Sequence, residues 1–202
     1  MRLEESKRDF YRKKAKREGL RSRAAYKLIQ IDKKYRIFKE RQIIIDVGCA
    51  PGGWLQIASN KVGSKGLVLG IDIQEVVPEP NSKVLIADIR NDDIVTRILE
   101  QIPTKADVVL SDMAPNLSGI WELDQAKQID LTLEVVEMLP KILKDNGTAI
   151  MKVFQGKMFD EFLAEVKKQF KKVKIVKPEA SRSQSSEVYV LCVKKIGKEI
   201  TD

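Results

Sequence analysis

The chain contains no histidine, and it has only two cysteines among its 202 residues. Without an imidazole, the protein cannot use a serine-type catalytic triad, a histidine base or a histidine-ligated metal site. Cys49 and Cys192 are too few and too far apart in sequence for a metal cluster or a disulfide framework. We expect both cysteines to be small packed residues, and we expect no metal cofactor.

Long hydrophobic runs are also missing. No apolar stretch approaches the roughly 20 residues that span a bilayer, and residues 1–10 are charged and lack the apolar centre of a secretory signal. We therefore expect a soluble, cytoplasmic protein without a membrane partner. A length of 202 residues suits one domain with an adequate core, so we expect a single domain over 1–202. We also expect a monomer.

Positive charge is concentrated in the N-terminal fifth of the chain. Residues 1–41 hold 16 Lys or Arg and 6 Asp or Glu, a net charge of +10, whereas the remainder has a net charge of −2. Such a cluster is typical of surfaces that bind phosphate groups and hence nucleic acid. We expect residues 1–36 to form a basic helical extension that binds RNA, with basic residues of 1–41 making contacts. A helix that is merely solvated is the alternative.

Residues 43–54, Ile-Ile-Ile-Asp-Val-Gly-Cys-Ala-Pro-Gly-Gly-Trp, predict a buried strand, a glycine-rich turn and the start of a helix. Gly48, Gly52 and Gly53 remove side chains where the backbone turns and a ligand approaches closely. Their spacing differs from the Gly-x-Gly-x-x-Gly pattern of dinucleotide-binding proteins, so NAD fits poorly. A different nucleotide-like ligand is indicated.

Acidic residues recur beside the predicted strand ends. Asp46 precedes the turn, Asp72 follows a strand over 67–71, and Asp88 follows a strand over 84–87. Carboxylates at these positions suit a ligand with ribose hydroxyls, an ammonium group and an adenine amino group, and S-adenosylmethionine has all three. Solvated strand-end carboxylates in an ordinary α/β protein are the alternative.

The rest of the chain alternates predicted strands and helices, which indicates a doubly wound sheet with ligands at the carboxyl ends of its strands. A fourth strand starts at Asp107 and delivers Asp112 to that edge. Further strands are predicted over 148–153, 173–176 and 187–193. Helices are predicted over 4–18, from an N-cap at Ser22 to 35, over 54–60, from a cap at Asn91 to 102, over 129–139 and over 159–170. Residues 116–122, with Trp121, are predicted to form an exposed loop.

Five segments resemble the FtsJ/RrmJ-type RNA ribose 2′-O-methyltransferases, in order and over nearly the whole chain. They are Ser22-Arg-Ala-Ala-Tyr-Lys-Leu28, Asp46-Val-Gly-Cys-Ala-Pro-Gly-Gly-Trp54, Ser111-Asp-Met-Ala-Pro115, Met151-Lys-Val-Phe154 and 181–189. The resemblance implies a Rossmann-like class I methyltransferase fold of the α/β class: a seven-stranded, mostly parallel sheet with an antiparallel last strand and helices on both faces. It also implies S-adenosylmethionine as the methyl donor.

The resemblance also implies roles for individual residues. A Lys-Asp-Lys-Glu catalytic tetrad falls on Lys27, Asp112, Lys152 and Glu187. Cofactor contacts fall on Gly52, Trp54, Asp72, Asp88 and Asp112. Ala25 and Cys49 depart from the residues of some members, but neither position supplies a reacting group. The implied substrate is a uridine in large-subunit ribosomal RNA, as free RNA or within the assembled subunit, and tRNA or another RNA remains an alternative.

The chemistry of the residues agrees with these roles. Methyl transfer from a sulfonium to oxygen is an in-line displacement, which depends mainly on positioning. Lys152, a lysine inside an apolar strand, is the best candidate to accept or guide the proton of a ribose hydroxyl. The direction of its pKa shift stays open, because Lys27 and burial oppose Asp112 and Glu187. A snorkelling Lys152, ordinary salt bridges at the carboxylates and a phosphate contact at Lys27 are the alternatives.

Other functions have specific weaknesses. Base methylation would favour an aromatic residue beside Asp112, where Met113 and Ala114 stand. Carbon-5 methylation of pyrimidines would favour a nearby cysteine nucleophile. A small-molecule O-methyltransferase would have no use for the basic N-terminal segment. A non-catalytic RNA-binding ribosome assembly factor remains an alternative, although the tetrad and the glycine turn are intact.

Overall fold

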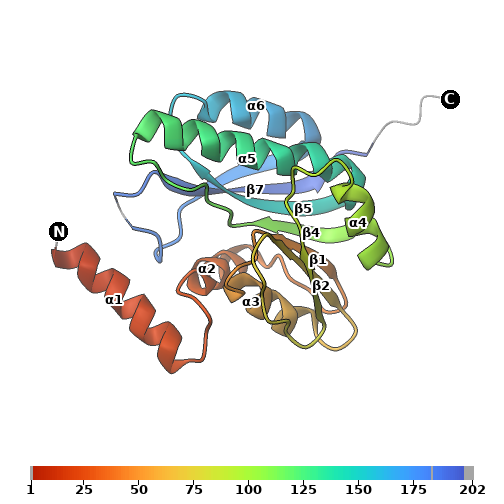
Figure 1. Cartoon of the computed structure of the whole chain (residues 1–202), viewed down its shortest axis with the longest axis horizontal. Helices are drawn as coiled ribbons and strands as arrows, with labels where there is room; N and C mark the ends of the chain where they lie inside the picture. The colour runs from red at the N-terminus through yellow and green to blue at the C-terminus, as the bar shows by residue number, and fades with distance from the viewer. Residues whose placement is uncertain (1, 183, 198–202) are drawn as a thin grey trace.

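The structure is a computed structural model, and it describes residues 2–182 and 184–197. Its centre is a seven-stranded sheet with the strand order β3-β2-β1-β4-β5-β7-β6 (Figure 1). The strands are β1 (Ile43–Val47), β2 (Leu67–Asp72), β3 (Ser82–Ile86), β4 (Ala106–Ser111), β5 (Leu143–Phe154), β6 (Phe170–Val176) and β7 (Glu187–Lys195). Strands β1 to β5 pair in parallel, whereas β7 is antiparallel to both of its neighbours. This arrangement confirms the predicted α/β sheet with an antiparallel last strand.

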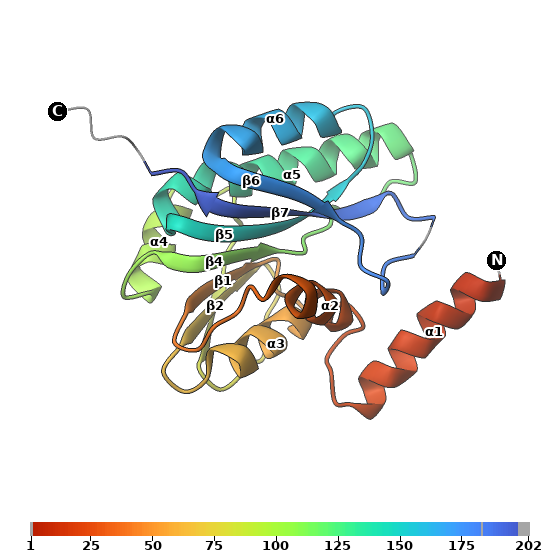
Figure 2. The ribbon, with the colours of Figure 1, turned by 180° about the vertical axis from the view of Figure 1, so that it is seen from behind.

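Helices cover both faces of the sheet, and one helix projects from it. The helices are α1 (Arg2–Arg17), α2 (Ala25–Tyr35), α3 (Gly53–Val62), α4 (Ile94–Gln101), α5 (Trp121–Ile142) and α6 (Phe159–Gln169). Helices α5 and α6 lie together on one face, and α2 and α3 lie on the other (Figures 1 and 2). Helix α1 extends outward beside α2 (Figure 2). Among the described residues, none of the helices combines the length and apolarity that a membrane span requires.

Strand β1 shows why its sequence forms the middle of this sheet. All five of its residues are buried. Ile43 and Ile45 pack into the hydrophobic cluster under α4, α5 and α6, whereas Ile44 packs into the cluster under α2 and α3. Successive side chains of a strand point to opposite faces, so a continuous β-branched run fills two cores at once.

Two predicted helix caps are wrong. Helix α2 begins at Ala25, and no side chain caps it, while Ser22 contributes only its carbonyl oxygen to the N–H of Ala25 at 3.3 Å. The hydroxyl of Ser22 instead packs against Gly53, where an added Cβ would collide with it. Helix α4 likewise begins after Asp93 without a side-chain cap, and Asn91 accepts the Ile94 N–H through its backbone. In both cases the first N–H group of the helix donates to a backbone carbonyl oxygen three residues earlier, where a capping side chain was expected to accept a hydrogen bond.

The predicted loop over 116–122 is two residues too long at its end, because α5 already begins at Trp121. Asp124 explains the difference. One of its carboxylate oxygens accepts the backbone N–H and the hydroxyl of Ser118, and the other accepts the N–H of Gly119 at 3.0 Å. These bonds fold the loop back onto the first turn of the helix and satisfy donors near its N-terminus.

Two strands begin earlier than their apolar residues indicate. Strand β5 starts at Leu143, not at 148, and β6 starts at Phe170, not at 173. In β5 the polar residues before Thr148 form an irregular segment in which Asn146 has φ +60° and the register against β4 shifts. Pairing continues through this bulge, which an apolar pattern alone does not reveal.

Candidate active site

The carboxyl ends of β1, β2, β3 and β4 enclose a cavity of about 560 Å³, which we call the strand-end cavity. Gly48, Asp72, Asp88 and Asp112 line it, together with Met113. Three of the carboxylates assigned to the cofactor from the sequence are therefore brought together, as expected for the ligand-binding edge of a doubly wound sheet. Ala87, Ile89 and Leu131 add apolar wall to the same cavity.

Hydrogen bonds to the end of β2 hold the glycine turn in place. The N–H groups of Gly48 and Cys49 both donate to the carbonyl oxygen of Ile71, and the N–H of Ala50 donates to the Asp72 carboxylate at 2.9 Å. Gly48 has φ +73°, and an added Cβ there would overlap the side chain of Met113. Glycine at position 48 is thus required both by the backbone conformation and by the cavity wall.

Gly52 and Trp54 do not line the strand-end cavity. Gly52 lies under the guanidinium of Arg21, where an added Cβ would collide with it. Trp54 is 3% exposed, its indole N–H donates to the carbonyl oxygen of Ala24 at 2.9 Å, and its ring centroid lies 5.5 Å from that of Tyr189. Trp54 therefore connects α3 to Ala24, the residue just before α2, and to Tyr189 of β7.

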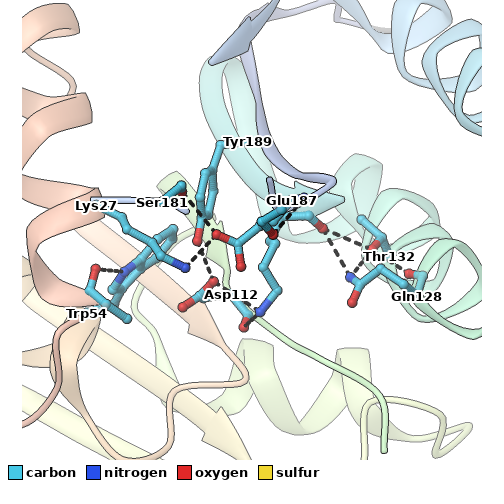
Figure 3. Close-up of polar contacts among 11 residues, drawn as sticks. Lys27, Trp54, Asp112, Gln128, Thr132, Ser181, Glu187 and Tyr189 are labelled. Atoms are coloured by element: carbon cyan, nitrogen blue, oxygen red, sulfur yellow. Dashed lines mark hydrogen bonds and ion pairs between the residues drawn. The ribbon is translucent and has the colours of Figure 1, made fainter. Parts of the chain in front are cut away.

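Lys27, Asp112 and Glu187 lie side by side (Figure 3), and together with Lys152 they form two ion pairs beside the strand-end cavity, which Asp112 lines. The Nζ of Lys27 donates to Glu187 Oε1 at 2.5 Å. The Nζ of Lys152 lies 2.5 Å from the backbone carbonyl oxygen of Asp112 and 3.2 Å from its Oδ1. Both lysines are buried, at 7% and 6% exposure. One helix and the ends of three strands converge to build this group.

The antiparallel pairing of β5 and β7 brings the two halves of the tetrad together. Lys152 pairs with Tyr189, and Phe154 pairs with Glu187. The backbone oxygen of Lys152 also accepts hydrogen bonds from Gln128 and Thr132 of α5 (Figure 3). Strand β5 is therefore fixed from both sides at the position that carries the lysine.

Two residues without a role in the sequence-based prediction complete the polar network. The hydroxyl of Tyr189 donates to Asp112 Oδ1 at 2.7 Å, and that of Ser181 donates to Glu187 Oε1 at 3.1 Å (Figure 3). Burial, followed by the charges of Asp112 and Glu187, raises the pKa of Tyr189 well above its usual value, so the phenol stays a donor. Tyr189 could have been found from its spacing in the sequence, because it stands two residues after Glu187 and therefore lies on the same face of β7.

Opposing effects act on the pKa of Glu187. Burial alone would raise it, but the charge of Lys27 and its hydrogen bond, the charge of Lys152 and the hydrogen bond from Ser181 lower it below its ordinary value. Glu187 is thus a carboxylate that holds Lys27 in place. The Nζ of Lys27 also lies 5.6 Å from the centre of the Tyr189 ring, which adds a cation–π contact to the ion pair.

Asp46 has a different environment. It is fully buried below the glycine turn, and within residues 2–182 and 184–197 neither of its carboxylate oxygens has a hydrogen-bond partner. Burial, then the charges of Asp112 and Asp72, raises the pKa of Asp46 well above its ordinary value. Asp72 and Asp112 line the cavity, and their negative charges suit a positively charged ligand. The same described part of the chain has no cluster of acidic or cysteine residues that could hold a metal ion.

The sheet order, the reversed β7 and the ligand cavity beside buried lysine–carboxylate pairs define the class of the protein as a Rossmann-like methyltransferase. The family follows from sequence comparison. A model of the FtsJ-like methyltransferase family matches residues 20–195, and the chain belongs to this family of enzymes.

Similar proteins are known from archaea. A protein of Methanocaldococcus jannaschii is 46% identical over 198 residues, which cover 96% of this chain and 81% of the relative. A protein of Nitrosopumilus maritimus is 41% identical over 98% of this chain and 100% of its own. Both relatives are named ribosomal RNA large subunit methyltransferase E.

Solved structures are similar as well. A crystal structure of an assigned ribosomal RNA methyltransferase from Plasmodium falciparum is 31% identical, with a TM-score of 0.79 over 88% of this chain and 100% of the other. An assigned rRNA methylase from Clostridium thermocellum has a TM-score of 0.58 at 17% identity, over 84% of this chain and 97% of the other, which shows the fold alone.

Proposed function

We propose that the protein transfers a methyl group from S-adenosylmethionine to the ribose 2′-hydroxyl of a uridine in large-subunit ribosomal RNA. The observation that carries this proposal is the pair of buried ion pairs, Lys27–Glu187 and Lys152–Asp112, beside a cavity closed by a glycine turn. The names of the archaeal relatives support ribosomal RNA as the substrate. The protein would act in the cytoplasm as a monomer.

The strand-end cavity fits S-adenosylmethionine on three counts. Asp72 and Asp88 stand at its rim, where carboxylates can accept hydrogen bonds from ribose hydroxyls and an adenine amino group. Gly48 leaves room for a close approach of the ligand to the backbone. The unsatisfied carboxylate of Asp46 lies near enough to Asp72 and Asp112 to interact with their charges, and a cationic ligand would relieve that repulsion. When bound, S-adenosylmethionine supplies an electrophilic methyl group.

Lys152 is placed to orient the acceptor. Both oxygens near its Nζ belong to Asp112 and can only accept, so Lys152 donates to them. An ammonium has three N–H groups, and the third would point a hydrogen bond at the ribose oxygen and align its lone pair for in-line attack. This arrangement suits a Lys152 that orients the acceptor, with the hydroxyl proton leaving late.

Lys27 and Glu187 would hold the ribose from its other side. Their ion pair fixes the end of α2 against β7, and Ser181 adds a hydrogen bond to the same carboxylate. The RNA itself would be bound largely by basic residues of 1–41. The exposed Arg12, Lys13 and Lys16 on α1 are available for phosphate contacts on this side of the molecule.

Transfer of labelled methyl from S-adenosylmethionine to ribosomal subunits, free ribosomal RNA and tRNA tests the proposal, using RNA from cells that lack the protein. A ribose methyl makes the next phosphodiester bond resistant to alkaline hydrolysis, so the modified site can be mapped. We expect label at a ribose of large-subunit RNA. Label only on tRNA would replace the substrate, and label on a base would refute ribose methylation.

A further inference from the structure

A second large concavity lies at the opposite edge of the sheet, where the parallel strands begin. Its volume is about 830 Å³, and it is formed by the segment before β1, the starts of β4 and β5, and the outer part of β6 and β7. Seven of its lining residues are Lys or Arg, and three are Asp or Glu. We call it the basic groove; six of its basic residues are Arg36, Lys39, Arg41, Lys172, Lys174 and Lys194.

Two of the three acidic residues of the basic groove are already engaged by other groups. Asp107 accepts the N–H of Ile43 and the Nζ of Lys144, each at 2.8 Å. Asp145 accepts the Nζ of Lys195 at 2.8 Å, which lowers the pKa of Asp145. These carboxylates therefore do little to neutralise the remaining cations.

The six basic residues that define the groove have no such partners. Within the described parts of the chain, 2–182 and 184–197, salt bridges join none of them to an acidic side chain. Lys172 and Lys174 are exposed on the edge strand β6 and point to the same face. A run of unpaired cations along a concave surface attracts a polyanion.

An aromatic ring lies in the wall of the basic groove. Tyr35, at the end of α2, is partly exposed, and the Nζ atoms of Lys34 and Lys174 lie 5.5 and 5.3 Å from its ring centre. Aromatic rings beside basic side chains are the usual platform for stacking an unpaired base while its phosphates are neutralised. Neither feature would be needed by a simple inorganic anion.

The basic groove is connected to the active site by two rigid elements, α2 and β5. Helix α2 carries Lys27 at one end and Tyr35 at the other, about 12 Å away along the helix axis. Strand β5 carries Thr148 in the groove and Lys152 in the site, about 13 Å apart. Two sites on one rigid body at this separation can be bridged by one folded RNA.

We propose that the basic groove binds the phosphate backbone of a second segment of the substrate RNA, so that the enzyme holds the RNA at both edges of its sheet. This inference rests on the proposed function, since it takes RNA as the substrate. The basic segment 1–41 then serves two surfaces. Its first part lies on α1, and its last part, with Arg36, Lys39 and Arg41, opens onto the groove on the far edge.

The test uses the full chain with Lys172→Glu and Lys174→Glu combined. The matched control combines Lys167→Glu and Lys171→Glu, which change the net charge equally; Lys171 alternates with Lys172 along β6 and so points to the opposite face, and Lys167 lies on α6. We expect the dissociation constant for free large-subunit RNA to rise about tenfold in the groove variant and about twofold or less in the control. The log–log salt slope should become shallower by about 1.4, for two lost phosphate contacts.

Methyl transfer separates the outcomes. With saturating RNA, the groove variant should keep the wild-type kcat within about twofold and show a higher KM, because the groove does not touch the reacting atoms.

Equal loss of RNA affinity in both variants would refute the proposal that the basic groove binds RNA. If the groove variant loses affinity for assembled subunits but not for free RNA, the basic groove binds a ribosomal protein and the proposal is wrong. If the wild type modifies no RNA yet the groove variant alone loses RNA affinity, the proposed function fails and the groove survives. Should the charge reversal impair folding, Lys172→Gln with Lys174→Gln gives the same comparison.

Discussion

At the scale of single residues, the buried ion pairs separate donor binding from acceptor chemistry. Within residues 2–182 and 184–197, the side-chain hydrogen bond and the ion pair of Lys152 both go to Asp112, one of the residues that line the strand-end cavity. The removal of Lys152 should therefore change the handling of the ribose hydroxyl more than the binding of the methyl donor.

We predict that Lys152→Ala lowers the rate of methyl transfer by about 10²- to 10⁴-fold, the range for a lost proton-handling group. The dissociation constant for S-adenosylmethionine should change by no more than about threefold. Single-turnover kinetics and equilibrium binding measure the two quantities. Lys168→Ala, an exposed lysine on α6, is the control and should match the wild type. Retained transfer in Lys152→Ala would remove this residue from the mechanism.

Asp46 offers a test through stability. A carboxyl whose pKa is higher in the folded than in the unfolded chain takes up a proton on folding. Its contribution therefore becomes less favourable as pH rises from the unfolded pKa, about 3.9, up to the folded pKa. Asp46→Asn lacks this titration, so the substitution should gain stability relative to the wild type as pH rises through that window.

Melting temperatures of both proteins between pH 5 and 8, without ligand, check this prediction for Asp46→Asn. Each kcal/mol gained should raise the melting temperature by about 2–4 °C. A difference in melting temperature that does not vary with pH would contradict the assigned environment of Asp46.

The sequence motifs identified the tetrad residues that the structure assembles, but not their supporting partners. Lys27 and Glu187 are 160 positions apart, and Tyr189 reaches Asp112 across 77 positions. Which side chains meet at such separations depends on the register of β7 against β5, and composition or spacing does not encode that register. Trp54 was assigned to the cofactor from its motif, whereas its packing against Ala24 and Tyr189 depends on tertiary structure.

At the scale of elements, periodicity predicted the strands and helices well and their ends poorly. Helix α5 starts early because Asp124 binds a loop from within the helix. Strand β5 runs on through a bulge at Asn146 because β4 offers a partner. Ends of elements depend on such neighbours, which an apolar repeat does not show.

The role of helix α1 in RNA binding can be tested by removing its positive charges. Ala15 packs with Tyr26 and Ala180, and Tyr11 accepts a hydrogen bond from Gln30, so the helix is attached by its apolar side. We predict that combined Arg12→Gln, Lys13→Gln and Lys16→Gln weakens RNA binding by about tenfold or more and reduces the salt slope by about 2. Titrations at several salt concentrations provide the measurement. An unchanged slope would exclude α1 from the RNA interface.

At the scale of the whole molecule, ligand binding should stabilise the entire sheet, because the strand-end cavity is built from the ends of four strands. S-adenosylmethionine at about 100 times its dissociation constant should add about 2.7 kcal/mol, or about 5–10 °C in melting temperature for a protein of this size. Thermal melts with and without the ligand test this. NAD is the control and should cause no shift, and an equal shift with NAD would contradict the assigned specificity of the cavity.

The position of β7 has a consequence for how the protein is made. Strand β6 is synthesised before β7, yet in the sheet it is hydrogen-bonded to β7 alone, and β5 needs β7 on its free edge. A growing chain that has not yet reached residue 187 thus has two open strand edges and lacks Glu187 altogether. The tetrad and the outer part of the sheet are therefore completed by the same late segment of the chain, β7.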